Sequence, residues 1–195
     1  MGRLPLVLAS TSPRRRALLE AAGIDFELVD PGDDGPSQAV DPAQRVLDHA
    51  RFKALEGARL RPGRRVLAAD TLVWVAGDFL PKPADREQAE AMLRRLSGRN
   101  HEVWTGVVLA TEGGRLLEAA DRAEVRFGPL PEGQLQSYLA GQEWCDKAGA
   151  YAIQGAAGRW AELVSGELET VIGLSTGTVL RLLAAADSCS PPSGG

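Results

Sequence analysis

The sequence of 195 residues has few of the residue types that build disulfide frameworks, zinc sites and basic surfaces. It contains two cysteines and two histidines, and none of them stands at CxxC or Cys/His spacing. Cys145 and Cys189 are therefore expected to be ordinary reduced thiols. The formal net charge is −4, so the chain lacks the basic excess of surfaces that bind nucleic acids or acidic membranes. Neither nucleic acid nor a membrane is an expected partner.

A long apolar run is also missing. No stretch approaches the about 20 apolar residues that a membrane-spanning helix needs. Met1 to Arg3 leads directly into the strand-like segment LPLVLA, which lacks the organisation of a signal peptide. These patterns predict a cytoplasmic protein, and 44% hydrophobic residues are enough for an ordinary globular core.

Short apolar runs alternate along the chain with capped, amphipathic segments, which predicts an α/β fold. Ser12-Pro13 and Asp41-Pro42 each place a capping residue before a proline and so mark two helix starts. The predicted helices are 13–22, 42–60, 85–96, 131–139 and 176–186, and the predicted strands are 4–9, 26–29, 66–70, 72–75, 79–80, 101–111, 116–127, 150–153 and 160–164. Residues 1–187 are expected to form one domain, followed by a disordered tail at 188–195 that is small, polar and proline-rich.

The first candidate site is the segment LVLASTSPRRR, from Leu6 to Arg16. A strand that turns into a helix presents free backbone N–H groups and the positive end of the helix dipole, here beside the Ser10 hydroxyl. Arg14 and Arg15 follow in the first turn, where guanidinium groups can bind phosphate oxygens through two hydrogen bonds. The segment is neither a Walker loop nor a GxGxxG fingerprint. It therefore indicates either a phosphate site or a capped helix with a solvated basic first turn.

Asp70 follows the apolar run VLAA, so its predicted position is the end of a strand, where ligand clefts of α/β folds form. A carboxylate there can orient water or hold a metal ion, but an aspartate that caps a turn has the same pattern. Lys82 lies between two prolines, on a stiff loop. Lys53 falls in the middle of a predicted helix, where a solvated face is the alternative to a role in binding.

Other polar residues have a weaker pattern. Asp33 and Asp34 could supply oxygen ligands to a metal ion or form a solvated turn. His49 and His101 are far apart and have no Cys or His at ligand spacing. We expect both histidines to be packing or surface residues, and no histidine-based mechanism is predicted.

Seven segments form an ordered set that covers almost the whole chain: ASTSPRRRALLEAAG from Ala9, ARFKA from Ala50, AADTLV from Ala68, LPKP from Leu80, MLRRLSGRNHEVWTGV from Met92, DKAGAYAIQG from Asp146 and VIGL from Val171. Together they resemble the Maf family of nucleotide pyrophosphatases. The resemblance implies an elongated mixed sheet with flanking helices and two lobes around a central cleft, similar to inosine triphosphate pyrophosphatases. It also implies hydrolysis of a nucleoside triphosphate to the monophosphate and pyrophosphate with Mg²⁺ or Mn²⁺, commonly by a homodimer.

The resemblance also implies roles for individual residues. Asp70 matches the catalytic proton acceptor that activates water, and Asp70 and Asp34 would bind the metal ion. The implied substrate-binding residues are Ser10, Arg14, Arg15, Lys53 and Lys82. Arg14, Thr71 and Gln154 match the specificity positions of the branch that acts on dTTP and UTP, so a normal or modified pyrimidine nucleotide is the expected substrate. An amide such as that of Gln154 can pair with the imide edge of uracil or thymine.

Three positions depart from the family pattern. His49 replaces the usual leucine before ARFKA, Ser175 replaces the proline expected after VIGL, and Asp33-Asp34 aligns imperfectly with the family's acidic pair. Asp34 is our choice for the acidic position, with Asp33 as the alternative.

Two other functions stay open. One is a nucleotide-binding regulator of cell division with little turnover, which the family's link to septum formation suggests. The other is a phosphatase with an aspartyl nucleophile in the Asp70-Thr71 pair. The second aspartate expected two residues away is Leu72 on one side and Ala68 on the other, which weighs against the phosphatase.

Overall fold

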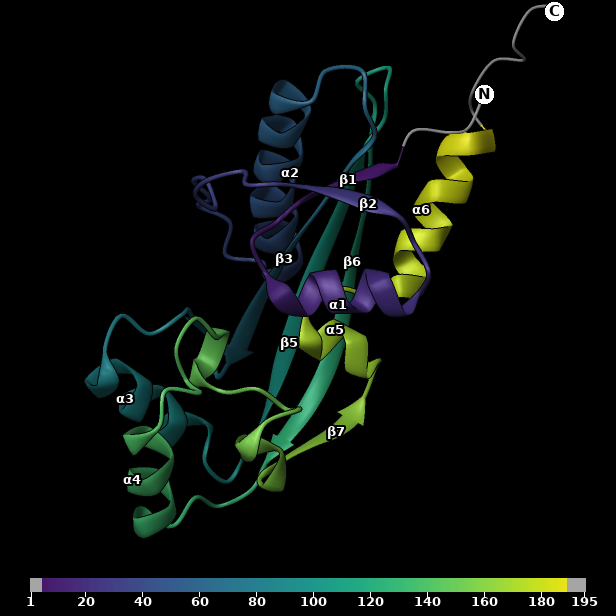
Figure 1. The fold of residues 1–195 in the computed structure, drawn as a ribbon. Helices are drawn as coiled ribbons and strands as arrows, with labels where there is room; N and C mark the ends of the chain where they lie inside the picture. Colours follow the sequence, from purple (N-terminus) through teal and green to yellow (C-terminus); the bar gives the residue numbers. More distant parts are fainter. Residues whose placement is uncertain (1–4, 189–195) are drawn as a thin grey trace, which may run out of the picture. The chain divides into compact units, whose positions relative to one another are not determined.

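The computed structural model describes residues 5–188, which fold as a mixed α/β protein (Figure 1). Its α-helices are α1 Pro13–Ala21, α2 Pro42–Leu60, α3 Arg86–Leu96, α4 Glu132–Ala140, α5 Leu168–Ile172 and α6 Thr176–Ser188. Its strands are β1 Leu6–Ala9, β2 Phe26–Val29, β3 Val66–Val75, β4 Asp78–Leu80, β5 Arg99–Ala110, β6 Leu116–Phe127 and β7 Ala161–Ser165. Two short 3₁₀ helices are η1 Ala148–Ala150 and η2 Ala156–Arg159.

The described strands form a seven-stranded sheet in the order β2-β1-β3-β5-β6-β7, and β4 pairs with β3. β1 pairs in parallel with both β2 and β3, whereas the β3–β4 and β6–β7 pairs are antiparallel. Parallel neighbours need a crossover connection, which α1 supplies between β1 and β2. The predicted mixed α/β fold with flanking helices is confirmed.

The chain divides into two compact units, and each has its own core. Of the described residues, the first unit contains 5–70, Gly106–Ala120 and 173–188. The second contains Thr71–Thr105 and Asp121–Ile172. Two lobes were expected from the resemblance, while the central cleft and a single domain over 1–187 stay predictions.

Side chains of β1 alternate between two apolar clusters of the first unit. Leu6 and Leu8 pack in a cluster with residues of α1 and α6, whereas Val7 and Ala9 pack in a cluster with residues of α2. Helices thus cover both faces of this strand (Figure 1). A strand buried on both faces needs apolar residues at every position, which explains the continuous run LVLA.

The core of the second unit forms where β3 and β6 meet the apolar faces of α3 and α4. Val73 and Phe127 belong to this core, as do Leu135 and Tyr138 of α4. The predicted apolar face of the 85–96 helix is confirmed by the buried residues of α3, which are Ala89, Met92, Leu93 and Leu96.

Two structural predictions are wrong. Asp70 lies inside β3 and not at its end, because the strand continues to Val75 and pairs with β4. Residues 150–153 do not form a strand, because Gly149 and Ala150 both have positive φ angles, of 68° and 63°, which bend the chain there.

Other expectations concern the chain ends and membranes. Of the predicted tail 188–195, Ser188 ends α6 and the remaining residues lie outside the described part, as does Cys189. Cys145 is a free thiol, as expected. None of the described helices combines the length and the apolar character needed to cross a bilayer.

Candidate active site

Asp70 lies on the face of β3 that packs against α2. Ala68, two residues earlier, belongs to the apolar cluster that contains Ala50 and Ala54 of α2. Side chains two residues apart in a strand point to the same face, so Asp70 also points toward α2. Its carboxylate is nearly buried, with 8% of the residue exposed. A buried charge of this kind needs partners.

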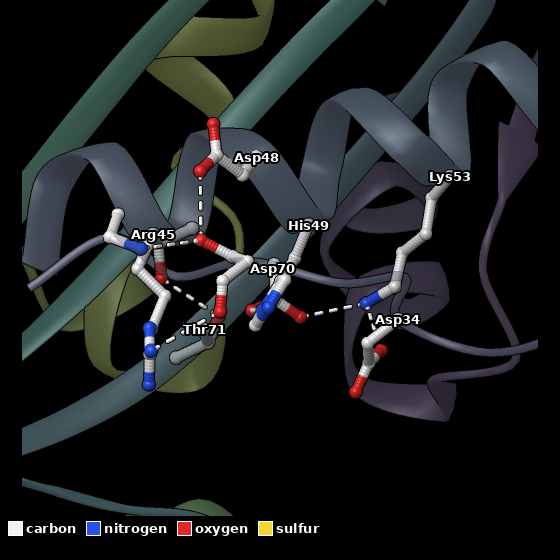
Figure 2. A network of polar contacts seen from close by, with 10 residues as sticks. Asp34, Arg45, Asp48, His49, Lys53, Asp70 and Thr71 are labelled. Carbon is white, nitrogen blue, oxygen red and sulfur yellow. Dashed lines mark hydrogen bonds and ion pairs between the residues drawn. The ribbon is translucent and has the colours of Figure 1, made fainter.

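Two side chains of α2 supply those partners (Figure 2). His49 and Lys53 stand four residues apart and so share one side of the helix. Lys53 Nζ lies 2.7 Å from Asp70 Oδ1 and 2.5 Å from Asp34 Oδ1. His49 Nδ1 lies 3.1 Å from Asp70 Oδ2. Each carboxylate oxygen of Asp70 therefore has one nitrogen partner from the same helix.

These partners determine the charge state of Asp70. Burial by itself would raise the pKa of this carboxyl, because it disfavours the charged form. The hydrogen bond with His49 and the positive charges of Lys53 and Arg15 outweigh burial and lower the pKa of Asp70 to about 2. Asp70 is therefore ionised throughout the pH range of ordinary assays.

The loop that carries Asp34 is held against α2. Ser37 Oγ donates to Asp48 Oδ2 at 2.8 Å, and Arg45 Nη2 donates to the Ser37 carbonyl at 3.3 Å. Gly35 has a φ of +74°, and a Cβ at this position would lie 2.3 Å from the Phe52 ring. The loop therefore needs glycine beside Asp34. Asp34, and not Asp33, is the acidic residue that forms an ion pair with Lys53.

The segment after β1 brings Ser10 and Arg15 together. The buried Ser10 Oγ accepts the backbone N–H of Ser12 at 3.2 Å and lies 3.4 Å from Arg15 Nη1. Arg15 Nε also donates to the Gly173 carbonyl at 2.9 Å. Burial lowers the pKa of the Arg15 guanidinium, and the charge of Asp70 partly offsets this effect. The half-buried Arg14 is close enough for its charge to act on Arg15 as well.

The start of α1 retains the features of an anion site. Ser12 occupies the N-cap position and Pro13 the first turn, as predicted, but the Ser12 side chain makes no capping hydrogen bond. The first turn contains no acidic residue. The N-terminus of this helix therefore has neither a side-chain cap nor a carboxylate in its own first turn, and a bound phosphate could interact favourably with the helix dipole there.

Thr71, Lys82 and Gln154 belong to the second unit. Thr71 Oγ1 lies 2.8 Å from Thr105 Oγ1, and Thr105 Oγ1 donates to the Thr170 carbonyl at 2.8 Å. Thr105 has a single hydroxyl hydrogen, so Thr71 must be the donor of the hydrogen bond between the two threonines. This chain of hydrogen bonds holds the Thr71 side chain in one orientation.

Lys82 and Gln154 are exposed residues on loops that neighbouring groups anchor. The carbonyl of Pro81, next to Lys82, accepts the backbone N–H of Gly149 at 3.2 Å. After Gln154 in the sequence, Ala156 N donates to Glu143 Oε2 at 3.0 Å. A Cβ at Gly155 would lie 2.1 Å from Glu143 Oε1, so this backbone packs closely against Glu143. Each loop therefore has a hydrogen bond from its backbone to a neighbouring segment and an exposed side chain.

Of the predicted site residues, Asp34 and Asp70 both form ion pairs with Lys53, and Arg15 forms a hydrogen bond with Ser10. The alternative that Lys53 lies on a solvated helix face is wrong, because the residue is only 6% exposed. The alternative that Asp70 caps a turn is also wrong, because Asp70 lies within β3. His49 is partly buried and contacts Asp70, a contact that the sequence analysis did not predict. The four-residue spacing between His49 and Lys53 was a signal for it, because it places both side chains on one side of the helix.

In the cluster formed by Asp34, His49, Lys53 and Asp70, the side chains that can bind a metal ion are the two carboxylates and the His49 imidazole. Within residues 5–188, no three His, Cys, Asp or Glu side chains are arranged to hold a metal ion.

Known proteins were found that are similar to this chain over most of its length. Residues 5–186 match the family described as Maf-like protein. A Symbiobacterium thermophilum protein named dTTP/UTP pyrophosphatase is 45% identical over 179 residues, which cover 91% of this chain and 92% of the relative. A Deinococcus radiodurans protein of the same name is 40% identical over 181 residues, which cover 93% of this chain and 92% of the relative.

Among solved structures, the nucleoside-triphosphatase / dITP/XTP pyrophosphatase of Mycobacterium abscessus aligns with 95% of this chain and 95% of its own, with 19% identity and a TM-score of 0.49. The family match spans nearly every described residue, and the curated relatives match over nine-tenths of the chain. This chain therefore belongs to the Maf-like protein family.

Proposed function

We propose that this chain is a nucleoside triphosphate pyrophosphatase that hydrolyses dTTP and UTP, or modified pyrimidine nucleotides, to the monophosphate and pyrophosphate. The observation that carries the proposal is the buried Lys53–Asp70 ion pair, with Asp34 on the same ammonium and Arg15 acting on the same carboxylate. The names of relatives at 40% to 45% identity support the substrate class.

The cationic groups suit a triphosphate. Ser10, Arg14, Arg15, Lys53 and Lys82 would bind the phosphates, together with the backbone N–H groups at the start of α1. The reaction breaks the anhydride bond between the α- and β-phosphates. The oxygen of a water molecule forms the new bond to phosphorus. Phosphoryl transfer needs mainly positioning and neutralisation of charge, and these residues can supply both.

Asp70 would act on the attacking water. With a pKa of about 2 it is a weak base, yet it is always available as a hydrogen-bond acceptor. We infer that its main contribution is to orient the water molecule and to attract the proton that the water loses. The two contacts from α2 leave further lone pairs of the carboxylate for this purpose.

We propose that a divalent cation, Mg²⁺ or Mn²⁺, binds at this position together with the substrate. Asp34 and Asp70 have two negative charges and share one ammonium group, which neutralises only part of their charge. Mg²⁺ commonly takes one or two carboxylates and completes its shell with water and substrate phosphates. Asp34 and Asp70 would therefore hold the cation together with the triphosphate. When bound, the cation would neutralise charge on the phosphates.

Specificity would come from Arg14, Thr71 and Gln154, as the resemblance implies. The side-chain amide of Gln154 has donors and an acceptor, and so does the imide edge of uracil or thymine. From the resemblance we further propose a cytoplasmic homodimer, which sedimentation of the purified protein would test for its oligomeric state.

The test is a nucleotide panel with product identification, with Mg²⁺ and with Mn²⁺. Wild type should release pyrophosphate and the monophosphate from dTTP and UTP faster than from the purine nucleotides. Asp70→Asn should lower turnover by about 10²-fold or more, since it removes the charge that acts on water. Full activity of Asp70→Asn would contradict the role of Asp70.

Two other outcomes would point to other functions. Release of orthophosphate alone would indicate a phosphatase. Tight nucleotide binding without turnover would indicate a nucleotide-binding regulator.

A further inference from the structure

We propose that His49 is a positioning residue, which fixes the orientation of the Asp70 carboxylate for the reaction. This inference rests on the proposed function, because it concerns the carboxylate that would act on water. It adds a residue that the sequence pattern assigned to packing or to the surface.

The geometry is a two-point clamp from one helix (Figure 2). His49 Nδ1 is 3.1 Å from Asp70 Oδ2, and Lys53 Nζ is 2.7 Å from Asp70 Oδ1. A carboxylate with one partner can still rotate about its Cβ–Cγ bond. A second partner on the other oxygen fixes its plane, and α2 supplies both partners from one side.

The direction of the hydrogen bond follows from the chemistry of the two groups. An ionised carboxylate has only acceptor sites, so the hydrogen between Asp70 and His49 must belong to the imidazole Nδ1. In the neutral imidazole the proton then stays on Nδ1, and Nε2 keeps its lone pair. This is a definite, measurable tautomer.

The consequence for the reaction lies in the lone pairs that remain. An ionised carboxylate has about four lone-pair sites, and Lys53 and His49 occupy two of them. The clamp gives the others fixed directions toward a water molecule or a cation. Residues that orient a reacting group through a hydrogen bond typically change rates by about 10- to 100-fold when they are lost.

Three substitutions separate this role from simple packing. In His49→Asn, the amide Nδ2 stands as many bonds from the backbone as Nδ1 of histidine, so the hydrogen bond can be kept. In His49→Gln the amide nitrogen is one bond farther out. His49→Leu has an apolar side chain with no donor, and leucine is the residue that the family resemblance leads us to expect here.

We expect His49→Leu and His49→Gln to lower kcat by about 10- to 100-fold with KM changed by less than about threefold. His49→Asn should keep kcat within about threefold of wild type. Thermal unfolding of each variant would show that the fold is retained. An active wild type in which the Asn and Leu variants have equal kcat would overturn this inference alone.

A spectroscopic readout needs no substrate. The chain has two histidines, so imidazole ¹⁵N spectra contain two sets of signals, and the spectrum of His49→Asn assigns the set that disappears. The neutral His49 ring should show a protonated Nδ1, and a protonated Nε2 with a bare Nδ1 would overturn the clamp. A wild-type protein without turnover would overturn both the proposed function and this inference. An active wild type whose His49→Asn variant loses as much kcat as His49→Leu would overturn this inference alone.

Discussion

Lys53 Nζ lies 2.7 Å from Asp70 Oδ1, and both residues are nearly buried, with 6% and 8% exposed. Removal of one partner of such a pair leaves a charge in a largely desolvated position, which is more costly than loss of an exposed pair. The pair therefore matters for stability as well as for the proposed chemistry.

Lys53→Met should lower the free energy of unfolding by about 3 kcal/mol, because it leaves Asp70 without its closest cation. Urea denaturation measures the change. Asp34→Asn is the matched control, since Asp34 is half-exposed, and it should change stability by less than about 1 kcal/mol. The double variant Lys53→Met/Asp70→Asn should recover part of the loss, and a double variant less stable than Lys53→Met would contradict this explanation.

Gly106→Ala should disturb the position of α2. A Cβ at Gly106 would lie 2.6 Å from the carbonyl carbon and oxygen of Val46 and 2.9 Å from Leu47 N, which are backbone atoms of the helix that carries His49 and Lys53. We expect a loss of about 1–3 kcal/mol in unfolding free energy and a lower kcat/KM.

Gly113→Ala is the control for this prediction, because nothing lies within 4 Å of a Cβ at Gly113. Thermal unfolding and nucleotide turnover of both variants check it. Equal melting temperatures for the two would show that α2 and β5 can separate at little cost.

His101 should make stability depend on pH. Its side chain is 2% exposed, and burial lowers its pKa from 6.5 to about 4. Between these values the unfolded chain binds the proton and the folded protein does not, so stability is full above pH 6.5 and falls as the pH decreases toward 4. The loss should approach about 3 kcal/mol.

Denaturation at a series of pH values, in wild type and in His101→Gln, measures this effect. Glutamine can keep a hydrogen bond with Tyr151 Oη, which lies 2.6 Å from His101 Nε2, but it does not titrate. If both proteins lose stability equally as the pH decreases, His101 is not the group responsible.

Gln154→Glu should weaken pyrimidine recognition, because a carboxylate lacks the amide donors. We expect kcat/KM for UTP and dTTP to fall by about tenfold or more, with unchanged stability, since Gln154 is exposed. Gln142→Glu, another exposed glutamine of the second unit, adds the same charge and should have little effect. Kinetics of Gln154→Glu equal to those of wild type would remove this residue from base recognition.

Thr105→Val should remove the hydrogen bond between Thr71 and Thr105. Valine has the shape of threonine but no hydroxyl, so the Thr170 carbonyl loses the donor that lies 2.8 Å away. Unfolding free energy should fall by about 1–3 kcal/mol, and Thr105→Ser, which keeps the hydroxyl, should lose less. Chemical denaturation of the two variants tests the order.

Much of the fold could be predicted where local signals were strong. Helix α2 has the predicted bounds, because Asp41 caps it by accepting the Gln44 N–H at 2.8 Å and Pro42 begins it. The strand predicted at 150–153 is wrong for a tertiary reason. The Tyr138 hydroxyl donates to the Ala150 carbonyl at 3.2 Å and helps to hold a turn that local sequence did not indicate.

The amino-acid sequence by itself determined the apolar strands, the capped helices and the ordered motifs of the family, because these depend on residues close together in the chain. It also placed His49 and Lys53 on one side of a helix. Only the tertiary structure decided that this side faces Asp70, which is 17 residues from Lys53 and 21 from His49. That pairing arises because β3 alternates its side chains and α2 packs on the face that Ala68 and Asp70 share.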